Sequence, residues 1–89
     1  MIELGGNIKL VHFDDVEPAL LIVVKKVVGN YTKKISEHLS SFKEIEIRLE
    51  DKDTNHIKVK VIAEKEYKSE ATDKNLFFAL DKALSQILK

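Results

Sequence analysis

Apolar residues recur at helical spacing over Pro18–Leu39, the longest patterned stretch of the chain. They follow one another every three or four positions, which places them on one stripe of an α-helix. The stripe consists of Leu20, Val24, Val27, Val28, Tyr31, Ile35 and Leu39. Because strands seldom exceed about ten residues, a pattern that lasts about six turns predicts a helix. We expect Asp14 or Asp15 to cap its start and Pro18 to lie in its first turn. Gly29-Asn30 is its weak point, where a kink or break can occur.

Alternating apolar and charged residues predict strands on both sides of this helix. Met1–Phe13 has the pattern of one strand that is interrupted at Gly5-Gly6, where we expect a bulge or a tight turn. Glu44–Glu50 alternates most regularly, and its isoleucines and leucine are expected to face the core. His56–Ala63 is the next predicted strand, and a shorter one follows at Tyr67–Ala71.

A second amphipathic helix is predicted over Asp73–Leu88, with Thr72 or Asp73 as its cap. Its inner stripe consists of Leu76, Phe77, Leu80, Ala83, Leu84 and Ile87. The 89 residues therefore predict a single domain of the α+β class with the element order β-α-β-β-β-α. We expect a two-layer sandwich, in which both helices cover one face of a four-stranded mixed sheet. The last three strands should be antiparallel, and the first should lie parallel to the second.

Charge is balanced over the whole chain but unevenly distributed along it. Lys and Arg total 15, as do Asp and Glu, so no overall field attracts nucleic acid or a membrane. Between Pro18 and Ser36, however, there are four lysines and no acidic residue. The absence of cysteine excludes disulfides and thiolate chemistry. No apolar run approaches about 18 residues and no leader pattern is visible, so we expect a soluble cytoplasmic protein with no membrane partner.

Catalytic and metal-binding motifs are not found. His12, His38 and His56 are isolated, with no second ligand at a suitable spacing. Asp51–Asn55 resembles the start of a calcium-binding EF-hand loop, but His56 occupies its glycine position and Ile62 the position of its bidentate glutamate. There is no P-loop, GxGxxG or GxSxG motif. We therefore expect a protein that is not an enzyme and that takes neither a cofactor nor a small-molecule substrate.

Two surface features indicate a macromolecular partner. At about 100° per residue, Ile22 and Val23 fall on the lysine-bearing side of the first helix. Phe78 likewise lies opposite the inner stripe of the second helix. Apolar anchors rimmed by lysines are typical of a contact surface for a partner subunit or for RNA. The alternative is that these residues are singly exposed and that the lysines form a solvated face.

Three short strings resemble local motifs of a known family. Gly6–Leu10 resembles Gly-x-Asn-Ile-x-Val at the end of that family's first strand, and Pro18–Leu20 resembles the Thr-Pro-Ala-Leu that opens its long helix. Asn75–Asp81 resembles Asp-Met-Tyr-x-Ala-Ile-Asp in its last helix. With the order of elements, these strings resemble the ribosome hibernation-promoting factor and ribosome-associated inhibitor family, in its short form. The chain differs from the family in the additional segment Val11–Glu17 and in Gln86, which stands at a basic position.

The resemblance implies a non-catalytic protein that binds the small ribosomal subunit in the channel of mRNA and tRNA and keeps idle ribosomes silent. The family contacts rRNA phosphates with basic side chains on its two helices. The corresponding RNA-binding candidates here are Lys25, Lys26, Lys33 and Lys34 on the first helix and Lys74, Lys82 and Lys89 on the second. Lys33 matches a basic position of the family, and the others are assigned by helix face.

Two alternatives to ribosome binding remain open from the sequence. One is a homodimeric protein-interaction module of the same fold with no RNA contact, whose interaction patch is formed by Ile22, Val23 and Phe78. The other is a double-stranded-RNA-binding domain, which shares the β-β-β-α half of the predicted order. Such a domain would need several lysines at the start of the last helix, and this chain has only Lys74 there.

Overall fold

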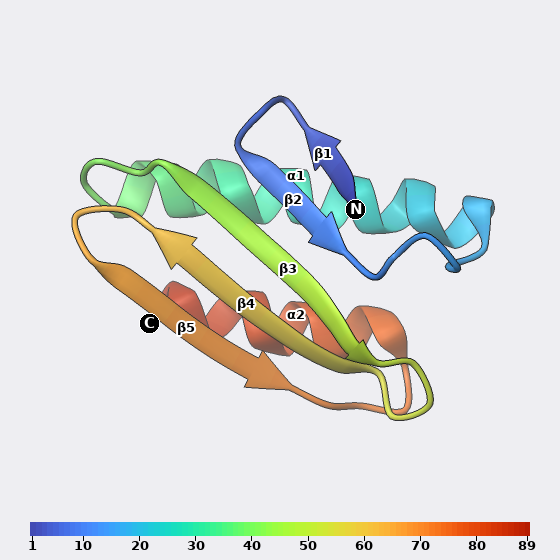
Figure 1. Cartoon of the computed structure of the whole chain (residues 1–89). Helices are drawn as coiled ribbons and strands as arrows, with labels where there is room; N and C mark the ends of the chain where they lie inside the picture. The colour runs from blue at the N-terminus through green and yellow to red at the C-terminus, as the bar shows by residue number, and fades with distance from the viewer.

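Five strands and two helices make up the computed structural model, which describes residues 1–89. The elements are β1 (Ile2–Leu4), β2 (Ile8–Val11), α1 (Pro18–His38), β3 (Glu44–Asp51), β4 (His56–Ile62), β5 (Glu66–Ala71) and α2 (Leu76–Ile87). The strands form one mixed sheet in the order β1-β2-β3-β4-β5 (Figure 1). The α+β class is confirmed. The predicted strand directions are also confirmed. Strands β3, β4 and β5 pair antiparallel, and β2 pairs parallel with β3, to which α1 connects it.

The predicted four-stranded sheet is wrong by one strand, because the N-terminal segment forms a hairpin. Gly5 and Gly6 have φ angles of 62° and 79°, a left-handed conformation that suits glycine and the tight turns of hairpins. The interruption is therefore a turn, which reverses the chain and pairs β1 antiparallel with β2. Ile2 lies opposite Leu10, and Leu4 lies opposite Ile8. This register keeps all four apolar side chains on the face of the sheet that packs against the core.

Helix α1 runs without a break through Gly29-Asn30. Neither Asp14 nor Asp15 caps it, because the chain before the helix forms a turn closed by the Val16 N–H and the Phe13 carbonyl at 3.1 Å. Glu17 occupies the N-cap position without a side-chain hydrogen bond, and Pro18 begins the helix. The buried residues of α1 are Val24, Val28, Thr32 and Ile35.

Leu20 was predicted in the buried stripe of α1, and its exposed fraction of 40% shows that this is wrong. At about 100° per residue, the side of the helix that carries Val24, Val28 and Ile35 passes through Leu21, and Leu20 lies well to one side of it. Leu21 is accordingly the leucine that packs against the core.

Helix α2 begins later than predicted, at Leu76, and its cap is Asn75 rather than Thr72 or Asp73. The Asn75 side-chain oxygen accepts hydrogen bonds from the backbone N–H groups of Phe77 and Phe78 at 2.8 and 3.2 Å. Asp73 instead accepts from the Asn75 N–H at 3.0 Å, one turn before the helix. The buried residues of α2 are Ala79, Leu80, Ala83, Leu84 and Ile87.

The core lies between the sheet and the helices, which are both behind the sheet in Figure 1. Burial alternates along the central strands, so Ile45, Ile47 and Leu49 of β3 face inward while the charged residues between them face outward. Phe13, in the loop after β2, is fully buried and anchors this loop to the core. Neither helix is long and apolar enough to cross a lipid bilayer.

Candidate nucleic-acid interface

The lysines of α1 are all exposed, and the ion pairs of the molecule involve other residues. Lys26 and Lys33 are seven residues apart, which is about two turns, so they share the outer face of the helix. Lys25 and Lys34 are nine residues apart, which places them on opposite flanks of it. The Lys34 ammonium lies 5.6 Å from the centre of the Tyr31 ring, in a cation–π contact. The outer face of α1 therefore carries two uncompensated cations, with one further cation on each flank.

The three candidate lysines of the second helix differ from those of α1. The Lys82 ammonium donates to the Asp73 carboxylate at 2.7 Å, and this hydrogen bond lowers the pKa of Asp73. The charge of Lys82 is thus compensated within the molecule. Lys74 precedes α2 and lines a shallow hollow that also contains Asp53 and Asp73. Lys89 follows the helix as the last residue. The structure does not bring these three lysines together as one cationic group.

The apolar residues of the predicted interaction patch are exposed. The exposed fraction is 61% for Ile22, 42% for Val23 and 62% for Phe78. Leu20, which the sequence pattern assigned to the core, is a third exposed apolar side chain on α1, after Ile22 and Val23. Three large apolar side chains are therefore exposed within the first turns of α1.

Tyr31 joins the two helices and sets their relative register. Its hydroxyl donates a hydrogen bond to the Asp81 carboxylate, which raises the pKa of Tyr31 to about 12. The two helices run in the same direction (Figure 1). At about 1.5 Å per residue, Val23 lies about 12 Å before Tyr31 and Phe78 about 4.5 Å before Asp81. Phe78 and Val23 therefore differ by less than two turns in their positions along the helix pair.

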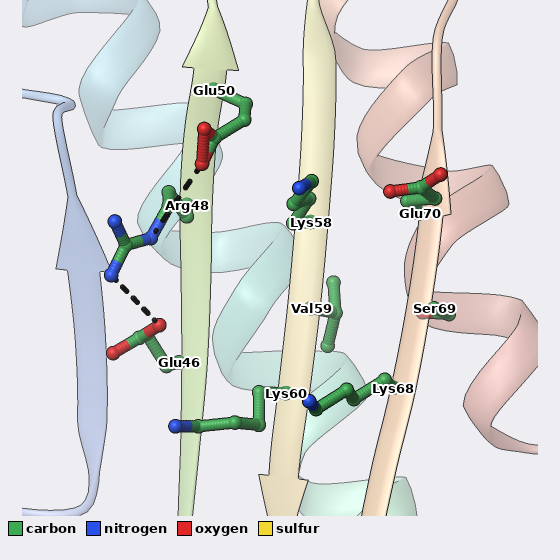
Figure 2. Close-up of a pocket in the computed structure, with 9 residues that line it drawn as sticks. All are labelled: Glu46, Arg48, Glu50, Lys58, Val59, Lys60, Lys68, Ser69 and Glu70. Carbon is green, nitrogen blue, oxygen red and sulfur yellow. Dashed lines mark hydrogen bonds and ion pairs between the residues drawn. The ribbon is translucent and has the colours of Figure 1, made fainter.

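The face of the sheet opposite the helices is charged but nearly balanced. Strands β3, β4 and β5 border an open hollow of about 450 Å³, shown in Figure 2. Its lining is Glu46, Arg48, Glu50, Lys58, Val59, Lys60, Lys68, Ser69 and Glu70. The Arg48 guanidinium lies between Glu46 at 3.4 Å and Glu50 at 3.9 Å (Figure 2). Four cations and three carboxylates leave little net charge here, so this face is a weaker candidate for binding an anion than the outer face of α1.

Of the three histidines, only His56 lies against a carboxylate. No group of three or more His, Asp or Glu side chains is placed to hold a metal ion. His56 lies 3.4 Å from the Glu70 carboxylate, across the β4–β5 ladder. Of Asp51–Asn55, Asp51 ends β3 and residues 52–55 connect it to β4, where Asn55 adopts a positive φ of 50°. The Asn55 side chain donates to the backbone carbonyl of Lys74 at 3.0 Å, so this residue fastens the turn to the start of α2.

Comparison with known proteins adds no identification, because no protein-family model and no curated protein matches the chain. The resemblance to the hibernation-factor family is carried by its three short strings and by the order of the elements. The structure adds the hairpin partner β1 to that order. It also places the extra segment Val11–Glu17 mainly in the connection between β2 and α1, beside the start of the long helix.

Proposed function

We propose that this chain is a non-catalytic, cytoplasmic RNA-binding factor that associates with the small ribosomal subunit through the outer face of α1. The observation that carries the proposal is the set of exposed lysines on α1, none of which is paired with a carboxylate. In this proposal the helices and the sheet form a two-layer sandwich, so the balanced charges of the sheet are turned away from the RNA. The resemblance to ribosome-associated inhibitors supports the choice of the small subunit as the partner.

Binding would be electrostatic and would not depend on base sequence. Lys26 and Lys33 are about 10 Å apart along the helix axis, so each would contact a different phosphate. Lys25 and Lys34 would add contacts on either flank. Each phosphate contact releases counterions, so affinity should fall steeply as salt is added. Phosphates carry no base identity, and these lysines would therefore position the protein without selecting a sequence.

The test is co-sedimentation of the protein with purified small ribosomal subunits over a range of salt concentrations. We expect binding at low salt and its loss as salt rises. The variant Lys26→Gln/Lys33→Gln should bind more weakly, with a plot of log affinity against log salt that is flatter by about 1.4 if each contact contributes about 0.7. Lys58→Gln/Lys60→Gln removes the same charge from the sheet face and is the matched control.

Two results would contradict the proposal. One is the absence of co-sedimentation at every salt concentration. The other is an equal loss of binding in the two double variants, because it would show that overall charge, rather than the outer face of α1, determines the association. Circular dichroism of each variant checks that it remains folded.

A further inference from the structure

The first turns of α1 are apolar on every side. Pro18–Val24 contains seven consecutive apolar residues, of which Leu21 and Val24 pack into the core. Ile22 and Val23 stay exposed. Exposed β-branched residues lower helix propensity and gain nothing from burial, so they weaken the isolated chain locally. Residues that lower helix stability without adding buried apolar area to the core indicate a surface that is covered by a partner.

Charged residues of opposite sign flank this apolar surface in the sequence, the acidic ones just before the helix and the basic ones within it. Asp15 and Glu17 precede it, are exposed, and take part in no ion pair. Lys26 and Lys33 follow it on the outer face. The order along the chain, from the turn before α1 into the helix, is therefore acidic, apolar, basic. A surface with this order is complementary to its own copy when the two are antiparallel, because each acidic end then meets a basic end.

We propose that the outer face of α1 binds a second copy of this chain, antiparallel, across a two-fold axis that passes between Ile22 and Val23. Ile22 of each copy then packs against Val23 of the other copy at the centre. Lys26 of one copy lies opposite Ala19 of the other, because both are three to four residues from the axis. The flexible four-carbon stem of Lys26 covers Ala19 while its ammonium group reaches Glu17, and Lys33 reaches Asp15 in the same way.

The dimer is expected to be weak. A standard interface buries roughly 800 Å² on each partner, which is about a seventh of the total surface of 5337 Å². The apolar centre is small; Phe78 is also exposed and differs from Val23 by less than two turns in its position along the helix pair, so it would enlarge the surface. This inference does not depend on RNA binding. Because Lys26 and Lys33 are used in both, dimerisation and phosphate binding would compete.

The oligomeric state in solution tests the inference directly. Sedimentation equilibrium of the wild type over a concentration series should show a monomer–dimer equilibrium. Ile22→Glu/Val23→Glu should raise the dissociation constant about tenfold or more, because it places four carboxylates at the centre of the interface. Ser41→Glu/Thr54→Glu adds the same charge at exposed turn positions and should leave the equilibrium unchanged. Thermal unfolding confirms that each variant is folded.

A charge exchange tests the antiparallel arrangement itself. Asp15→Lys/Glu17→Lys makes both ends of the surface basic, and Lys26→Glu/Lys33→Glu makes both ends acidic. Each variant alone should associate more weakly than the wild type, and an equimolar mixture should form a heterodimer. A wild type that is monomeric at every concentration would overturn the inference, as would two exchange variants that do not associate when mixed. Neither result bears on ribosome co-sedimentation, so the two proposals can fail separately.

Discussion

At the scale of single residues, Tyr31 has the clearest structural role. Its ring packs against the core while its hydroxyl reaches Asp81 on the neighbouring helix. The hydrophobic pattern predicted the first contact, because a tyrosine at helical spacing belongs to the buried stripe. The second contact joins residues 50 positions apart and depends on how the helices lie together. An amphipathic side chain at the edge of a core serves both purposes.

Removing the hydroxyl measures this link between the helices. Tyr31→Phe should lower the free energy of unfolding by about 1–2 kcal/mol at neutral pH, since it leaves the ring in place and deletes one hydrogen bond to a carboxylate. The folded pKa of Tyr31 is raised to about 12 from 10. The stabilisation is therefore complete below pH 10 and is lost as the pH rises through 12. Urea unfolding of the wild type and of Tyr31→Phe should be measured from pH 7 to 12. The difference between their free energies of unfolding should shrink between pH 10 and pH 12.

Tyr67→Phe is the matched control for that measurement. The Tyr67 hydroxyl also donates to a carboxylate, that of Glu64 at 2.5 Å, but the two residues are only three positions apart. This bond is exposed, closes a local turn and joins no separate elements, so its loss should cost clearly less stability than the loss of the Tyr31 bond. Equal destabilisation by the two substitutions would show that the link between α1 and α2 has no special importance for stability.

At the scale of elements, the continuity of α1 can be tested at Gly29. This glycine lies inside a regular helix, and a Cβ atom added to it would meet no other atom within 4 Å. Gly29→Ala should therefore raise the free energy of unfolding by about 0.5–1 kcal/mol, because alanine loses less backbone entropy in a helix. Thermal unfolding should show a melting temperature several degrees higher, by roughly 4–8 °C per kcal/mol in a domain of this size.

Gly6→Ala should act in the opposite direction. Gly6 has a φ of 79° in the turn between β1 and β2, a conformation that strains any residue with a Cβ atom. The expected result is destabilisation by about 1 kcal/mol, with the loss concentrated in the N-terminal hairpin. If Gly29→Ala destabilised the protein instead, α1 would have to be bent or broken at Gly29-Asn30 in solution.

The sequence predicted the elements better than their ends and their ion pairs. Hydrophobic spacing identified both helices and the three C-terminal strands, because burial of one face imposes a regular period. It did not decide between a bulge and a turn at Gly5-Gly6, since two glycines suit both and only strand pairing distinguishes them. Caps were misplaced because several neighbouring residues have suitable side chains. Asp73 and Asn75 both accept backbone hydrogen bonds, and the path of the chain decides which one begins the helix.

For the candidate site, the sequence predicted which side chains are exposed but not which of them form ion pairs. Periodicity correctly identified Ile22, Val23 and Phe78 as exposed, because the opposite side of each helix is committed to the core. It could not show that Lys82 is paired with Asp73, nine positions away. This ion pair depends on the route of the loop before α2, which hydrophobic periodicity does not describe. The predicted cationic set is therefore reduced in the fold to the lysines of α1, with Lys74 and Lys89 at the two ends of α2.

At the scale of the whole molecule, the two faces have different chemistry despite a net charge of zero. The sheet face carries cations and carboxylates in nearly equal numbers, and several of them pair with each other. The helix face carries exposed apolar residues and lysines without carboxylate partners. Charges that are paired with one another produce a weak net field and therefore attract a charged ligand only weakly. A partner, whether RNA or a second copy, is therefore expected on the helix face.

A comparison of two leucines separates residues that hold the fold together from residues that are free to bind. Leu10 is fully buried on β2, where it pairs with Ile2 and Ile47. Leu10→Ala should lower the free energy of unfolding by about 2–4 kcal/mol, because it leaves a cavity that the core cannot close. Leu20 belongs to the same hydrophobic pattern but is 40% exposed. Leu20→Ala should cost less than about 1 kcal/mol in the monomer, since alanine is the better helix former.

Urea unfolding at low protein concentration measures both substitutions without a contribution from self-association. Under those conditions a cost at Leu20 equal to that at Leu10 would mean that Leu20 is buried within the monomer, contrary to its place in this structure. At high concentration the expectation for Leu20→Ala differs, because Leu20 borders the proposed dimer surface. Any stability that the wild type gains with concentration should then be smaller in Leu20→Ala, while Leu10→Ala should lose the same amount at both concentrations.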